Sequence, residues 1–356
     1  MDTDPKINTI GSNRKGFAFV YFALTIAALM GFLALAIDLG HMYVVRGELQ
    51  NAADASALAG AASLYKDPLN PTAATSLDFN RARNAATSFV SQNKSDGVSL
   101  ANGTIATGCW NWTSKQMEAC TKTPPVSPQF AAVAATVARS GGNNNGPVPT
   151  FFARVFGVDD TAVSSRTAVA MVSGPSKGGP LFPMALSSCM TDHYFSQNPM
   201  PSTPPTINIT SVYAPVGSGC YTGQWTSFQL DTNNVPDIRD LIWQRIPSPL
   251  LQIDDNIWIQ PGTKATIFQE VNTWLPAGGK DVLMAVVDTG DTSSGSIMTH
   301  SEMKIKGFAT FHIDGAVATG NSKHVFGHFN AYYTTYPGTE SGGPVYNSIT
   351  NAQMVQ

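Results

Sequence analysis

The sequence predicts an α+β protein. A long N-terminal transmembrane helix continues into a small α+β unit, and a mostly-β, sandwich-like domain follows. Three observations lead to this prediction. Residues 17–37 contain no charged side chain, and no proline interrupts the chain between Pro5 and Pro68. Beyond residue 180, short runs of β-branched and aromatic residues alternate with turn residues, which is typical of strands.

The uncharged run Phe17–Ile37 is 21 residues long and predicts a membrane anchor. At about 1.5 Å per residue it spans roughly 30 Å, the thickness of the hydrocarbon core of a bilayer. Arg14 and Lys15 precede the run directly, whereas Asp38 follows it. The positive-inside bias therefore places residues 1–16 in the cytoplasm and the rest of the chain outside it. Cleavage as a signal peptide at Ala34-Leu35-Ala36 is the competing interpretation.

The helical pattern continues past the anchor to about Lys66, and a bend near Gly40 or Gly47 is the alternative to one straight helix. Seven of the eleven residues from Ala52 to Ala62 are alanine. Small side chains let helices approach closely. We therefore expect this segment to pack against helices of other proteins, through the positions Ala52, Ala53, Ala57 and Gly60.

The remainder of the chain divides at the Gly- and Pro-rich stretch Ser173–Pro180. Residues 38–173 hold the long helix and a small α+β extracytoplasmic unit, and residues 181–356 form the mostly-β extracytoplasmic domain. In the first unit we expect a helix over 77–93, a short helix over 150–156, and strands over 104–113, 131–138 and 162–172. In the second we expect a short helix over 237–243 and strands over 206–213, 225–230, 256–260, 282–287, 306–313 and 324–333.

The four cysteines are Cys109, Cys120, Cys189 and Cys220. An even number without a Cys-x-x-Cys pair suits disulfides in an oxidising compartment rather than a zinc or redox site. Four cysteines allow three pairings. The division of the chain favours Cys109–Cys120 and Cys189–Cys220, because each of these pairs then lies within one unit.

Two stretches resemble the TadE/TadG-like family of Flp (tight adherence) pilus-assembly proteins of bacteria. The first combines the segments Arg14–Phe17, Ala36–Tyr43 and Glu48–Ala61, and the second is Phe151–Gly157. The resemblance implies an envelope protein of the inner membrane without catalytic activity or cofactor. It implies other Flp-pilus assembly proteins as partners, with pilin as a further candidate.

Two departures from the family pattern matter. Gly290 stands where the metal site of longer members has a hydroxyl ligand, so we carry no metal site over. Tyr21 stands where the processing motif of pilins has Glu, five residues after Gly16, so we expect the span to be retained. A processed minor pilin is the alternative.

Motifs for chemistry are sparse. There is no Gly-x-Ser-x-Gly elbow and no Walker loop, and a net charge of -3 without a basic stripe argues against nucleic acid as a partner. His324 and His328 have a spacing that metal ligands use, but no third ligand is evident, and we expect no small-molecule substrate. The runner-up function is an anchored adhesin or carbohydrate-binding protein that uses exposed Trp225, Trp243 and Trp258.

Overall fold

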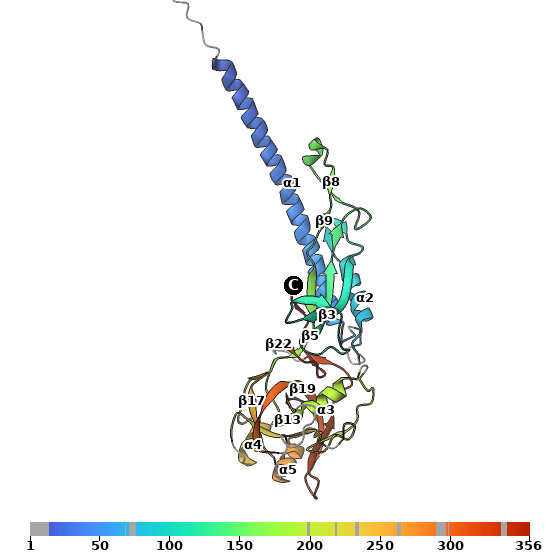
Figure 1. Cartoon of the computed structure of the whole chain (residues 1–356), viewed down its shortest axis with the longest axis vertical. Coiled ribbons are helices and arrows are strands. Elements are labelled where there is room, and N and C mark those ends of the chain that lie inside the picture. Colours follow the sequence, from blue (N-terminus) through green and yellow to red (C-terminus); the bar gives the residue numbers. More distant parts are fainter. Residues whose placement is uncertain are drawn as a thin grey trace, which may run out of the picture.

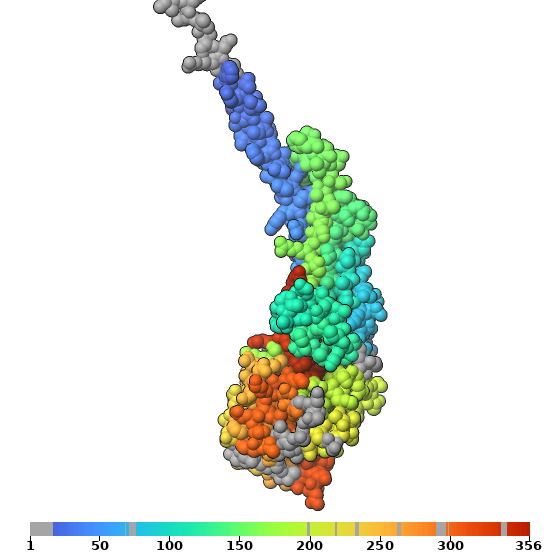
Figure 2. Space-filling model, viewed as in Figure 1, coloured from blue at the N-terminus to red at the C-terminus, as the bar shows by residue number. Residues whose placement is uncertain are grey.

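The computed structural model has two strand-rich regions placed end to end, with one long helix projecting from the first (Figure 1). It describes residues 14–356 apart from 68, 71–75, 198–199, 218, 232–234, 262–264, 290–296, 298 and 336–339. The helix α1 (Arg14–Ala62) has 49 residues and continues through Gly40 and Gly47 without interruption. Its N-terminal part stands clear of the body in the space-filling view (Figure 2), and its C-terminal part lies within the first region.

The helix α2 (Phe79–Ser91) packs against the C-terminal part of α1. It begins at Asp78, whose side chain accepts hydrogen bonds from the backbone N–H groups of Asn80 and Arg81 and so satisfies two donors that a helix N-terminus leaves free. The two helices approach closely at Gly60. A Cβ atom there would lie 3.0 Å from the Cβ of Ala86, so only glycine fits this contact without a shift.

Five antiparallel strands complete the first region, in the order β24-β10-β5-β3-β4. Their bounds are β3 (Thr104–Asn111), β4 (Gln116–Glu118), β5 (Gln129–Thr136), β10 (Ala168–Met171) and β24 (Gln353–Met354). Short strand pairs extend it: β1 (Lys94–Ser95) with β2 (Val98–Ser99), β6 (Ala138–Arg139) with β9 (Val163–Ser164), and β7 (Val148–Pro149) with β8 (Asp160–Thr161). The connection between β7 and β8 holds the 3-10 helix η1 (Ala153–Phe156).

The strand expected over 162–172 is divided into β9 and β10, which pair with different partners. Ser165 lies between them and bonds to the backbone of Val137 through both its N–H and its Oγ, so the chain turns here instead of continuing one ladder.

The second region contains a seven-stranded sheet, in the order β14-β20-β19-β17-β15-β13-β18, with a further pairing of β18 with β19. The strands are β13 (Met184–Ser187), β14 (Ile207–Ile209), β15 (Gly223–Phe228), β17 (Asn256–Ile259), β18 (Lys280–Val287), β19 (Ser301–Val317) and β20 (His324–His328). The extra pairing closes five of them into a ring, because β19 is 17 residues long and pairs with β17, β18 and β20 along its length. The expected sandwich of two facing sheets is therefore replaced by one closed sheet.

Three helices accompany this sheet: α3 (Ser188–Phe195), α4 (Val235–Ile242) and α5 (Ala265–Trp274). Short pairs of strands lie beside it: β11 (Gly174–Pro175) with β22 (Ser341–Gly343), β12 (Lys177–Gly178) with β16 (Leu251–Gln252), and β21 (Thr334–Thr335) with β23 (Ser348–Ile349). Alternate residues of β18 belong to two different apolar clusters, so both faces of this strand are buried.

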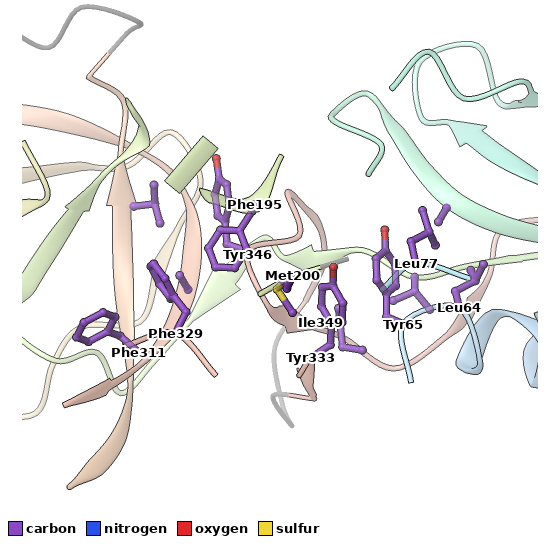
Figure 3. Close-up of a cluster of buried hydrophobic side chains, with 14 of the residues drawn as sticks. Leu64, Tyr65, Leu77, Phe195, Met200, Phe311, Phe329, Tyr333, Tyr346 and Ile349 are labelled. Carbon is purple, nitrogen blue, oxygen red and sulfur yellow. The ribbon is translucent and has the colours of Figure 1, made fainter. Parts of the chain in front are cut away.

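The two regions share one continuous apolar core (Figure 3). At their junction the rings of Tyr65 and Tyr333 lie 4.7 Å apart. The stretch expected as the domain boundary at residues 173–180 contains β11 and β12, and Ser173 is fully buried. The C-terminal strand β24 pairs with β10 of the first region. The division into units 38–173 and 181–356 remains a proposal, and in the structure the chain crosses between the regions more than once.

Candidate functional site along the long helix

The two parts of α1 have opposite surroundings. Every residue from Phe17 to Ile37 except Ala34 is exposed, including Phe19 at 78% and Phe32 at 71%. From Val45 onwards one face of the helix is buried in the first region. The exposed part is long and apolar enough to cross a membrane. Soluble monomers rarely expose an apolar surface of this size. It therefore indicates that lipid or another protein surrounds this part of the helix.

Asp38 lies at the boundary between the two parts and is itself buried. Its carboxylate accepts hydrogen bonds from the backbone N–H groups of Phe151, at 2.8 Å, Phe152, at 3.1 Å, and Ala153, at 2.6 Å. Hydrogen bonds to an ionised acceptor are short and strong. Asp38 thus fastens the β7–β8 connection to α1 at the residue where the apolar run ends. The short helix begins at Ala153, later than the residue 150 expected from the sequence, and the N–H of this first residue also bonds to the carboxylate.

A second connection lies one turn further along α1. The Nε2 atom of His41 is 3.0 Å from Oδ1 of Asp96, and Nη1 of Arg139 is 3.2 Å from Oδ2 of the same carboxylate. Glu48 contacts the same residue, which lies between β1 and β2: its Oε2 accepts a hydrogen bond of 2.6 Å from the backbone N–H of Asp96. The side chain of Arg139 is almost completely buried, so this is an internal charge network that joins the helix to β1 and β6.

Gln50 makes the third connection. Its Oε1 accepts a hydrogen bond of 2.9 Å from the backbone N–H of Arg166, in the turn between β9 and β10. Its amide nitrogen donates to Asp54 at 2.8 Å, which fixes the orientation of the side chain. Between Asp38 and Gln50 the helix is therefore joined to the first region by these polar contacts and by the buried side chains of Val45 and Leu49, and beyond Gln50 mainly by apolar packing.

These contacts unite the two stretches that resemble a known family. Residues 16–63 match the Flp pilus-assembly TadE/G-like family model, and residues 48–170 match the Tad-like Flp pilus-assembly model. Together the two matches cover residues 16–170. We call these residues the Tad segment. No curated protein and no solved structure matches the chain.

The face of α1 formed by Ala52, Ala53, Ala57 and Gly60, which we call the alanine face, is not available to a partner protein, contrary to our expectation. Ala52, Ala53 and Ala57 are fully buried within the chain. Gly60 lies against Ala82 and Ala86 of α2 and Val133 of β5. The close approach that small residues permit is used inside this protein, because α2 and β5 already cover the face.

Two disulfides lie at the cysteine positions. Cys109 on β3 is bonded to Cys120, which follows β4, within the Tad segment. Cys189 on α3 is bonded to Cys220, which precedes β15, in the second region. This is the pairing that the sequence favoured.

The tryptophans proposed as a binding face do not form one. Trp225 is 1% exposed and packs against Phe182 and Phe268 in the core, so its assignment as an exposed contact is wrong. Trp243 is 37% exposed and donates a hydrogen bond to Glu270. Trp258 stacks on His300 with the ring centroids 4.9 Å apart.

The two histidines that have the spacing of metal ligands are engaged in other contacts. His328 is 3.0 Å from Asp314, and His324 bonds to the backbone carbonyl of Ser322. Within the part of the chain that the structure describes, no group of His, Cys, Asp or Glu side chains is arranged to hold a metal ion. Gly290 lies outside the described residues.

A cleft of about 920 Å³ lies between the loop after Cys120 and the second region. Tyr346, on its wall, donates a hydrogen bond of 2.6 Å to Asp192, and Lys306 pairs with the same carboxylate at 2.8 Å. Burial raises the pKa of Tyr346, and the negative charge of Asp192 raises it further. The Tyr346 hydroxyl therefore keeps its proton at neutral pH and acts as a fixed donor at the junction of the two regions.

Proposed function

We propose that this protein is a membrane-anchored, non-enzymatic component of a Flp-type pilus-assembly machine that acts through contacts with other envelope proteins. One observation carries the proposal. The TadE/G-like match falls on a single helix whose first part is apolar and exposed and whose second part is fastened into a folded region from Asp38 onwards. This is the arrangement expected of a protein that holds a folded body at a fixed position beside a bilayer.

The proposed topology places residues 1–16 in the cytoplasm, residues 17–37 in the inner membrane and the bulk of the chain in the periplasm. Arg14 and Lys15 support this orientation, since cations gather on the cytoplasmic side of a span. The two disulfides support it as well, because they persist in oxidising compartments such as the periplasm.

The proposed partners are other Flp-pilus assembly proteins, with pilin as a further candidate. Because α2 and β5 cover the alanine face, partners have to bind elsewhere. The non-enzymatic role is supported by the family matches to pilus-assembly proteins rather than by any feature of the cleft.

Topology and association can be tested on the full chain. Alkaline phosphatase fused after Gln356 should be active, and fluorescent protein fused at the same position and exported by the same route should be dark. Affinity purification from detergent-solubilised membranes should recover other components of the pilus machine. An inactive, well-expressed phosphatase fusion would overturn the orientation, and recovery of no pilus component from piliated cells would overturn the assembly role.

Intact-mass analysis separates the anchored factor from the processed-pilin alternative. The anchored factor should retain residues 17–37. A mature N-terminus at Phe17, together with recovery of the protein throughout sheared filaments, would make it a minor pilin. A mature N-terminus after Ala36 would instead indicate signal-peptide cleavage.

A further inference from the structure

The connection between β7 and β8 ends in an exposed apolar tip, residues 151–158, on the Tad segment. Its large apolar side chains point to solvent, with Val155 at 79% and Phe156 at 83% exposed. Phe151, Phe152 and Val158 are exposed as well. Scattered single apolar residues on a surface need no explanation, but a contiguous group marks an interaction site.

The position of this tip along α1 is fixed by its contacts. The ring of Phe151 lies 5.0 Å from that of His41, and the backbone N–H of Ala153 binds Asp38. The chain therefore advances toward the N-terminus of α1 as it enters η1. Ala34, one turn before Asp38 on the same helix face, is the one residue between Phe17 and Ile37 that is not exposed. Figure 1 shows the tip beside α1, on the side of the body from which the helix projects.

We propose that the apolar tip inserts into the periplasmic leaflet of the membrane, as a second membrane contact beside the span. The inference rests on the proposed membrane anchor. If residues 17–37 fill the hydrocarbon core, Asp38 lies at its outer edge, and the level of Ala34 is about 6 Å inside it. The tip then reaches the depth at which interfacial elements bury their apolar face, roughly 5–10 Å into the boundary between headgroups and acyl chains.

The composition of the tip suits lipid. Phe152, Val155 and Phe156 supply apolar surface, and Arg154 is an exposed cation among them whose long side chain can extend to lipid phosphates. Asp38 is a positioning residue here, because it orients the connection and its carboxylate is satisfied by backbone N–H groups rather than facing lipid. With the tip and the span both inserted, the body is held at two points and cannot swing freely about the helix.

The test uses the full-length protein in vesicles of phosphatidylethanolamine and phosphatidylglycerol that contain spin-labelled lipids. The four native cysteines are joined in disulfides, so a single introduced cysteine can carry an environment-sensitive fluorophore. Phe156→Cys reports on the tip, Leu29→Cys reports on the span, and Leu250→Cys is the matched control, an exposed apolar residue of the second region. We expect the Leu29 and Phe156 probes to lose fluorescence and shift to the blue, and the Leu250 probe to do neither.

The outcomes separate the two proposals. Quenching at Leu29 without quenching at Phe156 would overturn tip insertion and leave the anchor intact. Absence of quenching at Leu29 would overturn the anchor itself. If the Phe156 probe is unquenched in vesicles but protected in native membranes, the occupant of the tip is a protein and the lipid proposal is wrong.

A second measurement addresses the positioning role. Asp38→Ala in the Phe156→Cys background should reduce the quenching at the tip while leaving that of a Leu29→Cys, Asp38→Ala protein unchanged. Unchanged quenching at Phe156 would show that Asp38 does not set the depth of the tip.

Discussion

Both parts of α1 have an apolar surface, yet the two surfaces have different neighbours. From Phe17 to Ile37 the helix displays exposed Phe, Leu and Ile side chains among smaller residues, and from Ala52 to Ala61 its buried face is made of Ala, Ser and Gly. Large exposed side chains suit a surrounding of fluid acyl chains, whereas small ones let a second helix approach closely. The size of the side chains, more than their hydrophobicity, distinguishes a face toward lipid from a face toward protein.

The largest expected effects come from placing one carboxylate in each part of the helix. Ala53→Asp buries an unpaired charge in the core, which costs several kcal/mol, so the first region should lose protease resistance while the protein stays in the membrane fraction. Ala28→Asp places the charge in the span, where it costs roughly 3 kcal/mol of insertion free energy, and should deplete the membrane fraction. Loss of protease resistance by both variants, or depletion of both from the membrane fraction, would refute the distinction between the two parts of the helix.

A conservative change gives a sharper version of the same contrast. Ala57→Leu overpacks the contact of α1 with the rest of the first region and should lower the free energy of unfolding by about 1–3 kcal/mol. Ala28→Leu, the same substitution at an exposed position of the span, should leave it unchanged. Chemical unfolding of both proteins in the same detergent measures the difference. Equal stabilities would show that the alanine face is not part of the core.

The sequence was sufficient for features that depend on neighbouring residues. The span follows from the absence of charge between Lys15 and Asp38, and the disulfide pairing follows from the positions of the cysteines along the chain. The alanine face was recognised as a packing surface, but its neighbour was not, because α2 begins 17 residues after α1 ends and the sequence does not indicate which surface it covers. Features that depend on distant pairing were missed. Closure of the sheet requires β19 to pair with both β17 and β18, and no local pattern specifies that.

Asp38 shows the same limit within the site. In the sequence it is a charge that ends the apolar run, whereas its partners begin 113 residues later. The one signal that linked the two was the resemblance of both stretches to a single family. Trp225 is the converse case, since an aromatic residue in a strand is equally compatible with a binding face and with a core.

Asp38→Asn should loosen the boundary between the two parts of α1 without unfolding either. Loss of the charge weakens hydrogen bonds that are each worth about 1.5–3 kcal/mol when one partner is ionised. Amide hydrogen exchange at Phe151, Phe152 and Ala153 should therefore accelerate by roughly tenfold or more. Asp159→Asn, an exposed carboxylate on the same connection, is the control and should leave these rates unchanged. Unaltered exchange in Asp38→Asn would mean that the connection is held by its own backbone.

The smallest effect is expected at the third connection. Gln50→Ala removes the neutral hydrogen bond from the N–H of Arg166, which contributes about 0.5–1.5 kcal/mol to stability, together with the contact to Asp54 within the helix. Asn51→Ala, at the adjacent exposed position of the same helix, controls for the change in helix propensity and should not destabilise the protein. Because Asp38 and the Asp96 network still join the helix to the body in both variants, neither should change membrane association or quenching at the tip. In chemical unfolding, the denaturant concentration at the midpoint should decrease for Gln50→Ala and stay unchanged for Asn51→Ala. A loss as large as that of Ala57→Leu would show that the polar connections, rather than the buried alanine face, hold the second part of α1 in place.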